Sequence, residues 1–182
     1  MNEEKGTKIG RGYVHVYTGN CKGKTTAALG LAFRAMGRGL KTYIGQFMKG
    51  QFYGELKAAD MVQPWITIEQ YGSETCIVSP ETKAQEDIEL ARHGLEKASA
   101  AMSSGQYDIV VLDEIITANF FQLISLGAIL EIIRSKPEGL ELILTGRYST
   151  KPIIDAADLV TEMKEVKHYY QKNVIAREGI ER

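Results

Sequence analysis

The feature that most constrains the fold is a glycine-rich turn, residues 18–26, which joins a β-forming segment to a helix-forming segment. Before the turn, Tyr13–Thr18 (YVHVYT) is rich in β-branched and aromatic residues, which favour strands. After it, Lys24–Met36 has the alanine, leucine and arginine content of a helix and is closed by nearby glycines. A strand that passes through such a turn directly into a helix begins a βαβ unit, so we expect a parallel sheet.

The same alternation of strands and helices continues along the chain. Further strands are expected at Thr42–Phe47, Trp65–Tyr71, Tyr107–Leu112, Leu140–Thr145 and, at an edge, Leu159–Met163. Further helices are expected from Ser79-Pro80 to Gly105, at Asn119–Ser135 with a break near Gly127, and at Pro152–Ala157. Short connections between alternating elements predict an α/β fold, a mostly parallel β-sheet flanked by helices, with ligands at the carboxyl ends of the strands.

The helix that ends at Gly105 has the clearest pattern. Ser79 is a suitable N-cap, and Pro80 suits the first helical position. Apolar residues then recur every three or four positions, at Ala84, Ile88, Ala91, Leu95, Ala98 and Met102. This spacing predicts one apolar face along the helix.

The composition excludes several classes of protein. With 182 residues and a net charge of −1, the chain has the length of one domain and no general excess of basic residues. We expect a flexible N-terminal arm at residues 1–12, a single domain at 13–182, and no nucleic-acid partner. The first residues are polar and no apolar run could span a bilayer, so we expect no membrane partner and a cytoplasmic location. Two cysteines, Cys21 and Cys76, are too few for a disulfide scaffold, and both are expected to be reduced.

The glycine-rich turn ends in Gly23-Lys24-Thr25, the second half of a Walker A motif. In such a loop, backbone N–H groups and the positive end of the following helix face a phosphate. Lys24 would neutralise phosphate charge, and the Thr25 hydroxyl would bind Mg²⁺. The first half differs from the usual motif, because Thr18 stands where the first glycine is expected. A plain strand–helix turn is the alternative interpretation.

An apolar strand ends in two carboxylates, Asp113 and Glu114, which is the Walker B arrangement. One carboxylate beside a phosphate loop can bind Mg²⁺, and the other can be a further ligand or a general base for water. The sequence does not assign the two roles. An acidic turn after a buried strand is the structural alternative.

Weaker signals lie elsewhere on the same expected edge. Arg147 follows the fifth strand and either clamps a phosphate or ribose or is a solvated loop residue. Residues 46–50 could contact a second substrate. Cys21 is expected to be prone to oxidation rather than catalytic, and Cys76 to be a small loop residue. His15 and His168 have no local pattern that suggests ligation.

These residues alone indicate a protein that binds Mg·nucleoside triphosphate. Guanine specificity usually requires an Asn-Lys-x-Asp segment after a strand, and the chain has none. ATP is therefore the favoured nucleotide.

Five blocks in order resemble one family: residues 17–28, 46–50, 110–114, 145–147 and 166–168. Together they are similar to the ATP:corrinoid adenosyltransferases of the CobA/CobO/BtuR type, from about Gly12 to Ile180. The resemblance implies a RecA-like P-loop NTPase fold and transfer of the 5′-deoxyadenosyl group of ATP to the Co(I) of a reduced corrinoid, with release of triphosphate. It implies cobalamin, cobinamide or cobyrinic acid a,c-diamide as substrate, Mg²⁺ or Mn²⁺ as cofactor, a flavoprotein reductant and a homodimer.

The resemblance also implies roles for individual residues. Lys24, Thr25 and Glu114 would be catalytic, with Thr25 and Glu114 as the metal ligands. The triphosphate and ribose would contact a larger set: Gly19, Asn20, Cys21, Lys22, Gly23, Lys24, Thr25, Thr26 and Arg147.

Three departures from the family pattern stand out. Cys21 replaces the middle glycine of the loop, and the N-terminal arm is short. The segment after the third strand, residues 72–76, lacks the aromatic pair that covers the lower face of the corrinoid, and only Tyr71 is aromatic there. The favoured substrate is therefore expected to be an incomplete corrinoid, unless Phe52 or Tyr53 replaces the pair.

Two other functions stay open on the residues alone. One is a P-loop Mg-ATPase in which Glu114 activates water, and the other is a nucleotide-gated binding module. The products distinguish them: intact triphosphate for the transferase, ADP and phosphate for the ATPase, and neither for the binding module.

Overall fold

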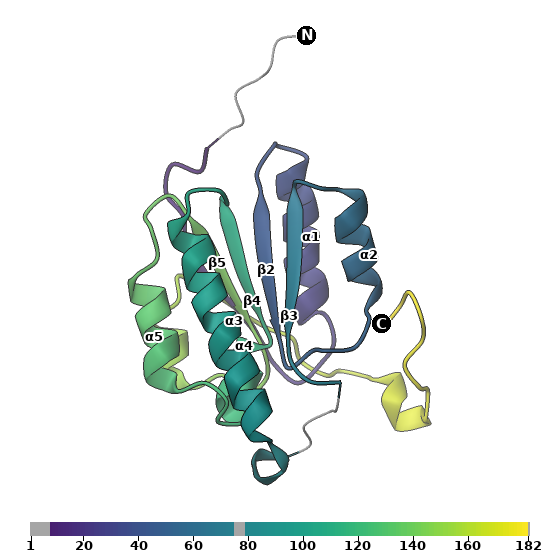
Figure 1. Ribbon diagram of the computed structural model, residues 1–182. Helices are drawn as coiled ribbons and strands as arrows, with labels where there is room; N and C mark the ends of the chain where they lie inside the picture. The colour runs from purple at the N-terminus through teal and green to yellow at the C-terminus, as the bar shows by residue number, and fades with distance from the viewer. Residues whose placement is uncertain (1–7, 75–78, 182) are drawn as a thin grey trace.

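A computed structural model describes residues 8–74 and 79–181. The strands are β1 (Val14–Thr18), β2 (Thr42–Phe47), β3 (Ile66–Tyr71), β4 (Ile109–Asp113), β5 (Glu141–Thr145) and β6 (Leu159–Glu162). Within the described residues they form one six-stranded sheet in the order β3-β2-β4-β5-β1-β6, and every neighbouring pair is parallel (Figure 1). The predicted parallel sheet is confirmed.

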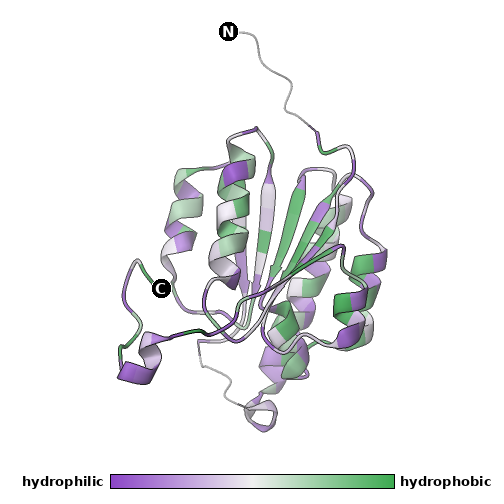
Figure 2. Cartoon of the chain, turned by 180° about the vertical axis from the view of Figure 1, so that it is seen from behind, coloured by the Kyte–Doolittle hydropathy of each residue, from purple (hydrophilic) through white to green (hydrophobic). Residues whose placement is uncertain are grey.

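Helices cover both faces of the sheet. They are α1 (Lys24–Met36), α2 (Gly54–Met61), α3 (Gln85–Ser103), α4 (Ile115–Phe120), α5 (Leu126–Arg134) and α6 (Lys151–Asp155), with short 3₁₀ turns η1 (Pro80–Thr82) and η2 (Tyr169–Lys172). Figure 1 shows α1 and α2 on one side and α3, α4 and α5 on the other. Each layer has its own hydrophobic core against the sheet, whose apolar strands lie between the helices in Figure 2.

The apolar face of α3 agrees with the predicted pattern except at its start. Ala91, Ala98 and Met102 are buried, but Ala84 is exposed because it precedes the helix. Gly94 is also buried on this face, and a Cβ there would lie 2.5 Å from Cγ of Tyr71. A pattern of apolar side chains cannot identify a position where the absence of a side chain permits the contact.

The predicted start of this helix at Ser79-Pro80 was wrong. Ser79 begins the separate 3₁₀ turn η1, and Lys83 then adopts an extended conformation. The helix α3 begins at Gln85, and its first turn is capped by Asp87, whose carboxylate accepts a hydrogen bond of 2.8 Å from the Ala84 N–H. The Ser-Pro pair was a real local signal for a helical turn, but for a different one.

The helix predicted at Asn119–Ser135 is two helices, α4 and α5, and the predicted break near Gly127 was misplaced. The chain turns at Gln122, which has a φ of 59°, and α5 then begins after Ser125, whose Oγ accepts from the Ala128 N–H at 3.2 Å. The helix α2 was not predicted at all. Its only buried residue among those described is Ala59, so it has almost no apolar stripe.

All four central strands end in the same way, and their ends meet at one edge of the sheet. The residue after each strand has a positive φ: Gly19 after β1 (102°), Met48 after β2 (59°), Glu114 after β4 (62°) and Gly146 after β5 (145°). Because the strands are parallel, these four turns meet at one edge of the sheet. Met48 and Glu114 are not glycines, and residues in this conformation concentrate at functional sites.

In the described part of the chain, no helix has both the length and the apolar character needed to cross a membrane.

Candidate active site

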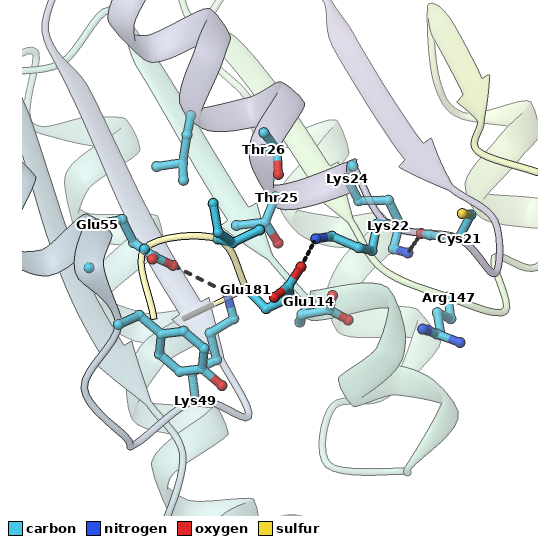
Figure 3. A pocket seen from close by; sticks show the side chains of 16 residues that line it. Cys21, Lys22, Lys24, Thr25, Thr26, Lys49, Glu55, Glu114, Arg147 and Glu181 are labelled. Carbon is cyan, nitrogen blue, oxygen red and sulfur yellow. Dashed lines mark hydrogen bonds and ion pairs between the residues drawn. The ribbon is translucent and has the colours of Figure 1, made fainter. Parts of the chain in front are cut away.

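A cavity of about 660 Å³ lies at the carboxyl edge of the sheet (Figure 3). Its walls come from the β1–α1 loop, the first turns of α1 and α2, the ends of β4 and β5, and the C-terminal tail. The lining residues are Cys21, Lys22, Gly23, Lys24, Thr25, Thr26, Leu29, Lys49, Tyr53, Gly54, Glu55, Glu114, Arg147, Gly179, Ile180 and Glu181. Most of the residues predicted from the sequence therefore surround one space.

Lys24 is almost completely buried and holds the loop in shape. Its Nζ donates to the carbonyl oxygens of Gly19 at 3.0 Å and of Cys21 at 2.8 Å. Burial lowers the pKa of Lys24, and the nearby Glu114 carboxylate opposes that shift. The ammonium group thus lies at the centre of the loop, where a phosphate would compensate its poor solvation.

The first half of the loop rests on the residue that follows β6. Gly19 has a positive φ, and a Cβ there would lie 2.4 Å from the carbonyl oxygen of Met163. The Cys21 N–H donates to the same oxygen at 3.1 Å. Cys21 is not among the described residues with a positive φ, so its replacement of the family's glycine causes no left-handed strain.

Asp113 is the centre of a buried hydrogen-bond network. Its Oδ1 accepts from the hydroxyls of Thr25 (2.9 Å) and Thr145 (2.7 Å). Its Oδ2 accepts from Nζ of Lys49 (2.9 Å) and Nε2 of Gln46 (3.3 Å). The side chain is fully buried, with four donors from three segments of the chain. Asp113 therefore connects the phosphate loop to the ends of β2 and β5, and it does so beneath the cavity wall.

Lys49 remains charged in this network. Burial acts to lower its pKa, but Asp113, together with the nearby carboxylates of Glu55 and Glu114, outweighs burial, and the net shift of the pKa is upward. Its Nζ also lies 3.6 Å from Oε1 of Glu55 and 4.9 Å from the centre of the Tyr53 ring. The lysine thereby links the buried Asp113 to the outer wall of the cavity.

Glu114 lines the cavity, unlike Asp113. Its positive φ turns the chain away from β4, and its N–H donates to Oγ1 of Thr145 at 2.9 Å. The hydroxyl of Thr117 donates to Oε2 of Glu114 and itself accepts from the Arg147 N–H at 2.8 Å. Thr117 thus holds the Glu114 carboxylate and the Arg147 backbone in a fixed relation.

The oxygens of Thr25 and Glu114 suit a hard divalent cation such as Mg²⁺, which prefers oxygen ligands and keeps several waters. Among the described residues, no group of three or more His, Cys, Asp or Glu side chains could hold a metal by itself. A cation at this position would therefore need substrate phosphate oxygens as further ligands.

Two predicted residues lie apart from the others. Gly19 and Asn20 line a neighbouring cavity of about 620 Å³, to which Arg147 also contributes. The side chain of Asn20 accepts a hydrogen bond of 3.2 Å from the Glu165 N–H, so it connects the loop to the tail. Arg147 lies between the two cavities.

The weaker sequence signals have mixed outcomes. His15 lies 2.6 Å from Glu141 at the opposite end of the strands, and the His168 ring accepts from the Tyr170 N–H, so neither lines the cavity. The flagged segment 46–50 does reach the site through Gln46 and Lys49. Cys76 lies outside the described residues.

Sequence reasoning missed Glu55 and the tail residues 179–181, and it named Tyr53 only as a candidate substitute aromatic for the corrinoid. Tyr53 and Glu55 follow β2 at the predicted ligand edge, which was an available signal. The tail is polar and mixed, so no local pattern placed it at the site.

The fold and the site place the chain among α/β proteins that have a cavity with charged and apolar walls at the carboxyl edge of a parallel sheet. The profile of the family described as "ATP:corrinoid adenosyltransferase BtuR/CobO/CobP" matches residues 10–182. The chain belongs to this family, and the resemblance inferred from the five sequence blocks is confirmed.

Three relatives have similar levels of identity. The corrinoid adenosyltransferase of Escherichia coli (strain K12) is 32% identical over 177 residues, covering 94% of this chain and 86% of that protein. The corrinoid adenosyltransferase CobA of Salmonella typhimurium is 32% identical over 177 residues, with the same coverage. The corrinoid adenosyltransferase of Pseudomonas aeruginosa is 32% identical over 176 residues, covering 94% of this chain and 84% of that protein.

Proposed function

We propose that this protein transfers the 5′-deoxyadenosyl group of ATP to the Co(I) of a reduced corrinoid and releases triphosphate. Its family and its relatives are named for ATP:corrinoid adenosyl transfer. The observation that carries the proposal is the single cavity in which Lys24 and Thr25 of the loop face Glu114 of the next motif. In the reaction, Co(I) supplies the electron pair of the new Co–C5′ bond, and the C5′–O bond breaks as triphosphate leaves.

The loop would bind the leaving group. The N–H groups at the start of α1 and the ammonium of Lys24 provide positive charge where the triphosphate gains negative charge. Preorganisation supports this role, because Lys24 is already fixed by the carbonyls of Gly19 and Cys21. Asn20, Lys22, Gly23 and Thr26 would complete the contacts, with Arg147 at the far wall.

We assign Mg²⁺ (or Mn²⁺) to Thr25 and Glu114. When bound, the cation would neutralise part of the triphosphate charge. Glu114 faces the cavity, whereas all four hydrogen bonds to Asp113 come from protein groups. Asp113 is therefore a positioning residue that holds Thr25.

The finer features rest on the resemblance. We infer the RecA-like P-loop NTPase class from the loop that follows β1 and the acidic pair that ends β4. A homodimer, a flavoprotein reductant, a cytoplasmic location and a single domain at 13–182 with an arm at 1–12 are parts of the same proposal.

We further propose that the preferred corrinoid lacks a tightly held lower base. Tyr71 is buried under α3, and its hydroxyl bonds to Tyr43 (2.7 Å) and Glu69, so it is not available to cover a corrin face. Higher kcat/KM for cobinamide than for cobalamin, with a flavin-type reductant, is the expected result. Equal values would contradict this preference and favour Phe52 or Tyr53 as the substitute aromatic.

The decisive experiment identifies the products. The protein is incubated in the dark with Mg·ATP and a chemically reduced corrinoid, and the mixture is examined for a light-sensitive Co–C product and for triphosphate. Both are expected in equal amounts. ADP and phosphate without a Co–C product would instead support the ATPase in which Glu114 activates water.

A further inference from the structure

The C-terminal tail returns to the phosphate loop. After β6 the chain crosses the carboxyl edge of the sheet, forms η2, and ends near the first turn of α2, as both ribbon views show (Figures 1 and 2). Its last described residues, Gly179, Ile180 and Glu181, line the same cavity as the loop. The tail is therefore a wall of the site, although no sequence motif marks it.

The carboxylate of Glu181 attaches the tail to the loop. Oε1 of Glu181 lies 2.6 Å from Nζ of Lys22, and the Tyr169 hydroxyl donates to the same carboxylate. Arg177 adds a backbone N–H donor at 2.9 Å and a guanidinium donor at 3.1 Å. Lys22 and Arg177 also lie 5.4 and 5.1 Å from the centre of the Tyr169 ring. Three side chains and one backbone group thus fix the position of Glu181 beside the loop.

The cavity has two chemically different parts. The loop contributes lysines and N–H groups, whereas Leu29, Tyr53 and Ile180 contribute apolar surface. Ile180 is 60% exposed even though it lines a cavity. A nucleoside triphosphate has the same two-part character, with an anionic chain and a flat, largely apolar base.

We propose that the C-terminal tail is part of the nucleotide site: Ile180 and Leu29 form the apolar slot for the base, and the Lys22–Glu181 ion pair holds that slot closed. The proposal rests on the proposed function only in taking the nucleotide to be ATP. An aliphatic wall removes the base from water but offers no hydrogen bonds to its edges. The tail therefore contributes affinity for the nucleoside part of ATP and none for the triphosphate part.

The test compares two ligands, Mg·ATP and Mg·triphosphate, by isothermal titration calorimetry without corrinoid. Ile180→Ala is expected to weaken the binding of Mg·ATP about five-fold, because it removes a few carbon atoms from one side of the contact. It is expected to leave the binding of Mg·triphosphate unchanged. Ile175→Ala is the matched control, because Ile175 lies on the same tail and is 82% exposed but does not line the cavity. An unchanged ATP affinity in Ile180→Ala, or an equal loss for both ligands, would overturn the proposal.

A second pair of variants tests the ion pair. Glu181→Ala frees Lys22 for phosphate and loosens the wall, so the ratio of the triphosphate to the ATP dissociation constant is expected to fall. Glu178→Ala, on the same tail, should keep the wild-type ratio. An unchanged ratio in Glu181→Ala would show that the ion pair does not hold the wall.

The outcomes separate this inference from the proposed function. If the wild-type protein binds ATP, responds to Ile180→Ala as expected and yet forms no Co–C product, only the transfer reaction is refuted. If the wild-type protein binds no ATP, both proposals are refuted.

Discussion

Two carboxylates flank the phosphate loop, and they differ in almost every physical respect. Asp113 lies at the end of a central strand, is fully buried and accepts four hydrogen bonds from three segments of the chain. Glu181 lies on the tail, and its partners Lys22 and Arg177 are substantially exposed. A buried ion pair cannot lose one partner without leaving an unsolvated charge, whereas water can replace a partner at the surface. We therefore expect the Asp113 network to fix the structure of the loop. We expect the Glu181 network to control access of ligands to the cavity beside the loop.

The largest expected effect concerns three residues of the loop, Lys22, Lys24 and Thr25. Lys24→Ala and Thr25→Ala should each lower transfer by about a hundredfold or more, because a preorganised charge or ligand at the leaving triphosphate is lost. Lys22→Ala should lower transfer by about tenfold, since Lys22 is exposed and already shares its charge with Glu181. The measurement is turnover at saturating Mg·ATP, with circular dichroism as the control for folding. Near-wild-type turnover in Lys24→Ala would refute the role of the loop.

The second largest expected effect is a difference in the free energy of unfolding between variants of Asp113 and Glu181. Asp113→Asn should lower the free energy of unfolding by about 3 kcal/mol, because the charge of Lys49 then lies buried beside a neutral amide. Asp108→Asn is the control, since Asp108 accepts a backbone N–H from Lys41 at 2.8 Å and an amide oxygen can do the same. Glu181→Gln should leave urea unfolding unchanged within error. Comparable losses in Asp113→Asn and Glu181→Gln would remove the distinction between the networks.

Metal dependence should distinguish Asp113 from its neighbour. Glu114→Gln should raise the Mg²⁺ concentration needed for half-maximal activity by about tenfold, because Glu114 faces the cavity and is the proposed ligand. Asp113→Asn should change this requirement less, once activity is normalised to the folded fraction. A metal titration of both variants decides the matter, and equal or reversed sensitivity would transfer the ligand role to Asp113.

The smallest expected effect is a difference in salt sensitivity. The Arg177 N–H is bonded to the Glu181 carboxylate on the tail, and the Glu114 N–H to the buried Thr145 hydroxyl. In about 1 M salt, where the Debye length is about 3 Å, hydrogen exchange at Arg177 should become several-fold faster. Exchange at Glu114 should remain unchanged. Equal responses of the two amides would indicate that the tail is held by contacts other than charge.

Local sequence signals predicted those parts of the site that directly follow a strand. The sequence indicated α1 with the same bounds as the structure, Lys24–Met36, because the glycine turn and the helix composition lie next to each other. It also identified Asp113 and Glu114 as a pair at a strand end. It could not divide their roles, because the donors to Asp113 come from residues distant in the chain, including Thr25 and Thr145.

The sequence by itself therefore determined the alternation of strands and helices, the glycine-rich turn before α1, the acidic pair and the family. Each depends on residues that are neighbours in the chain, or on motifs in a set order. Only the tertiary structure decided that β5 lies between β4 and β1, that Asp113 is enclosed while Glu114 faces the cavity, and that the tail returns to Lys22. These outcomes depend on strand order and on contacts between distant segments, and hydrophobic periodicity and local turn chemistry carry no information about either.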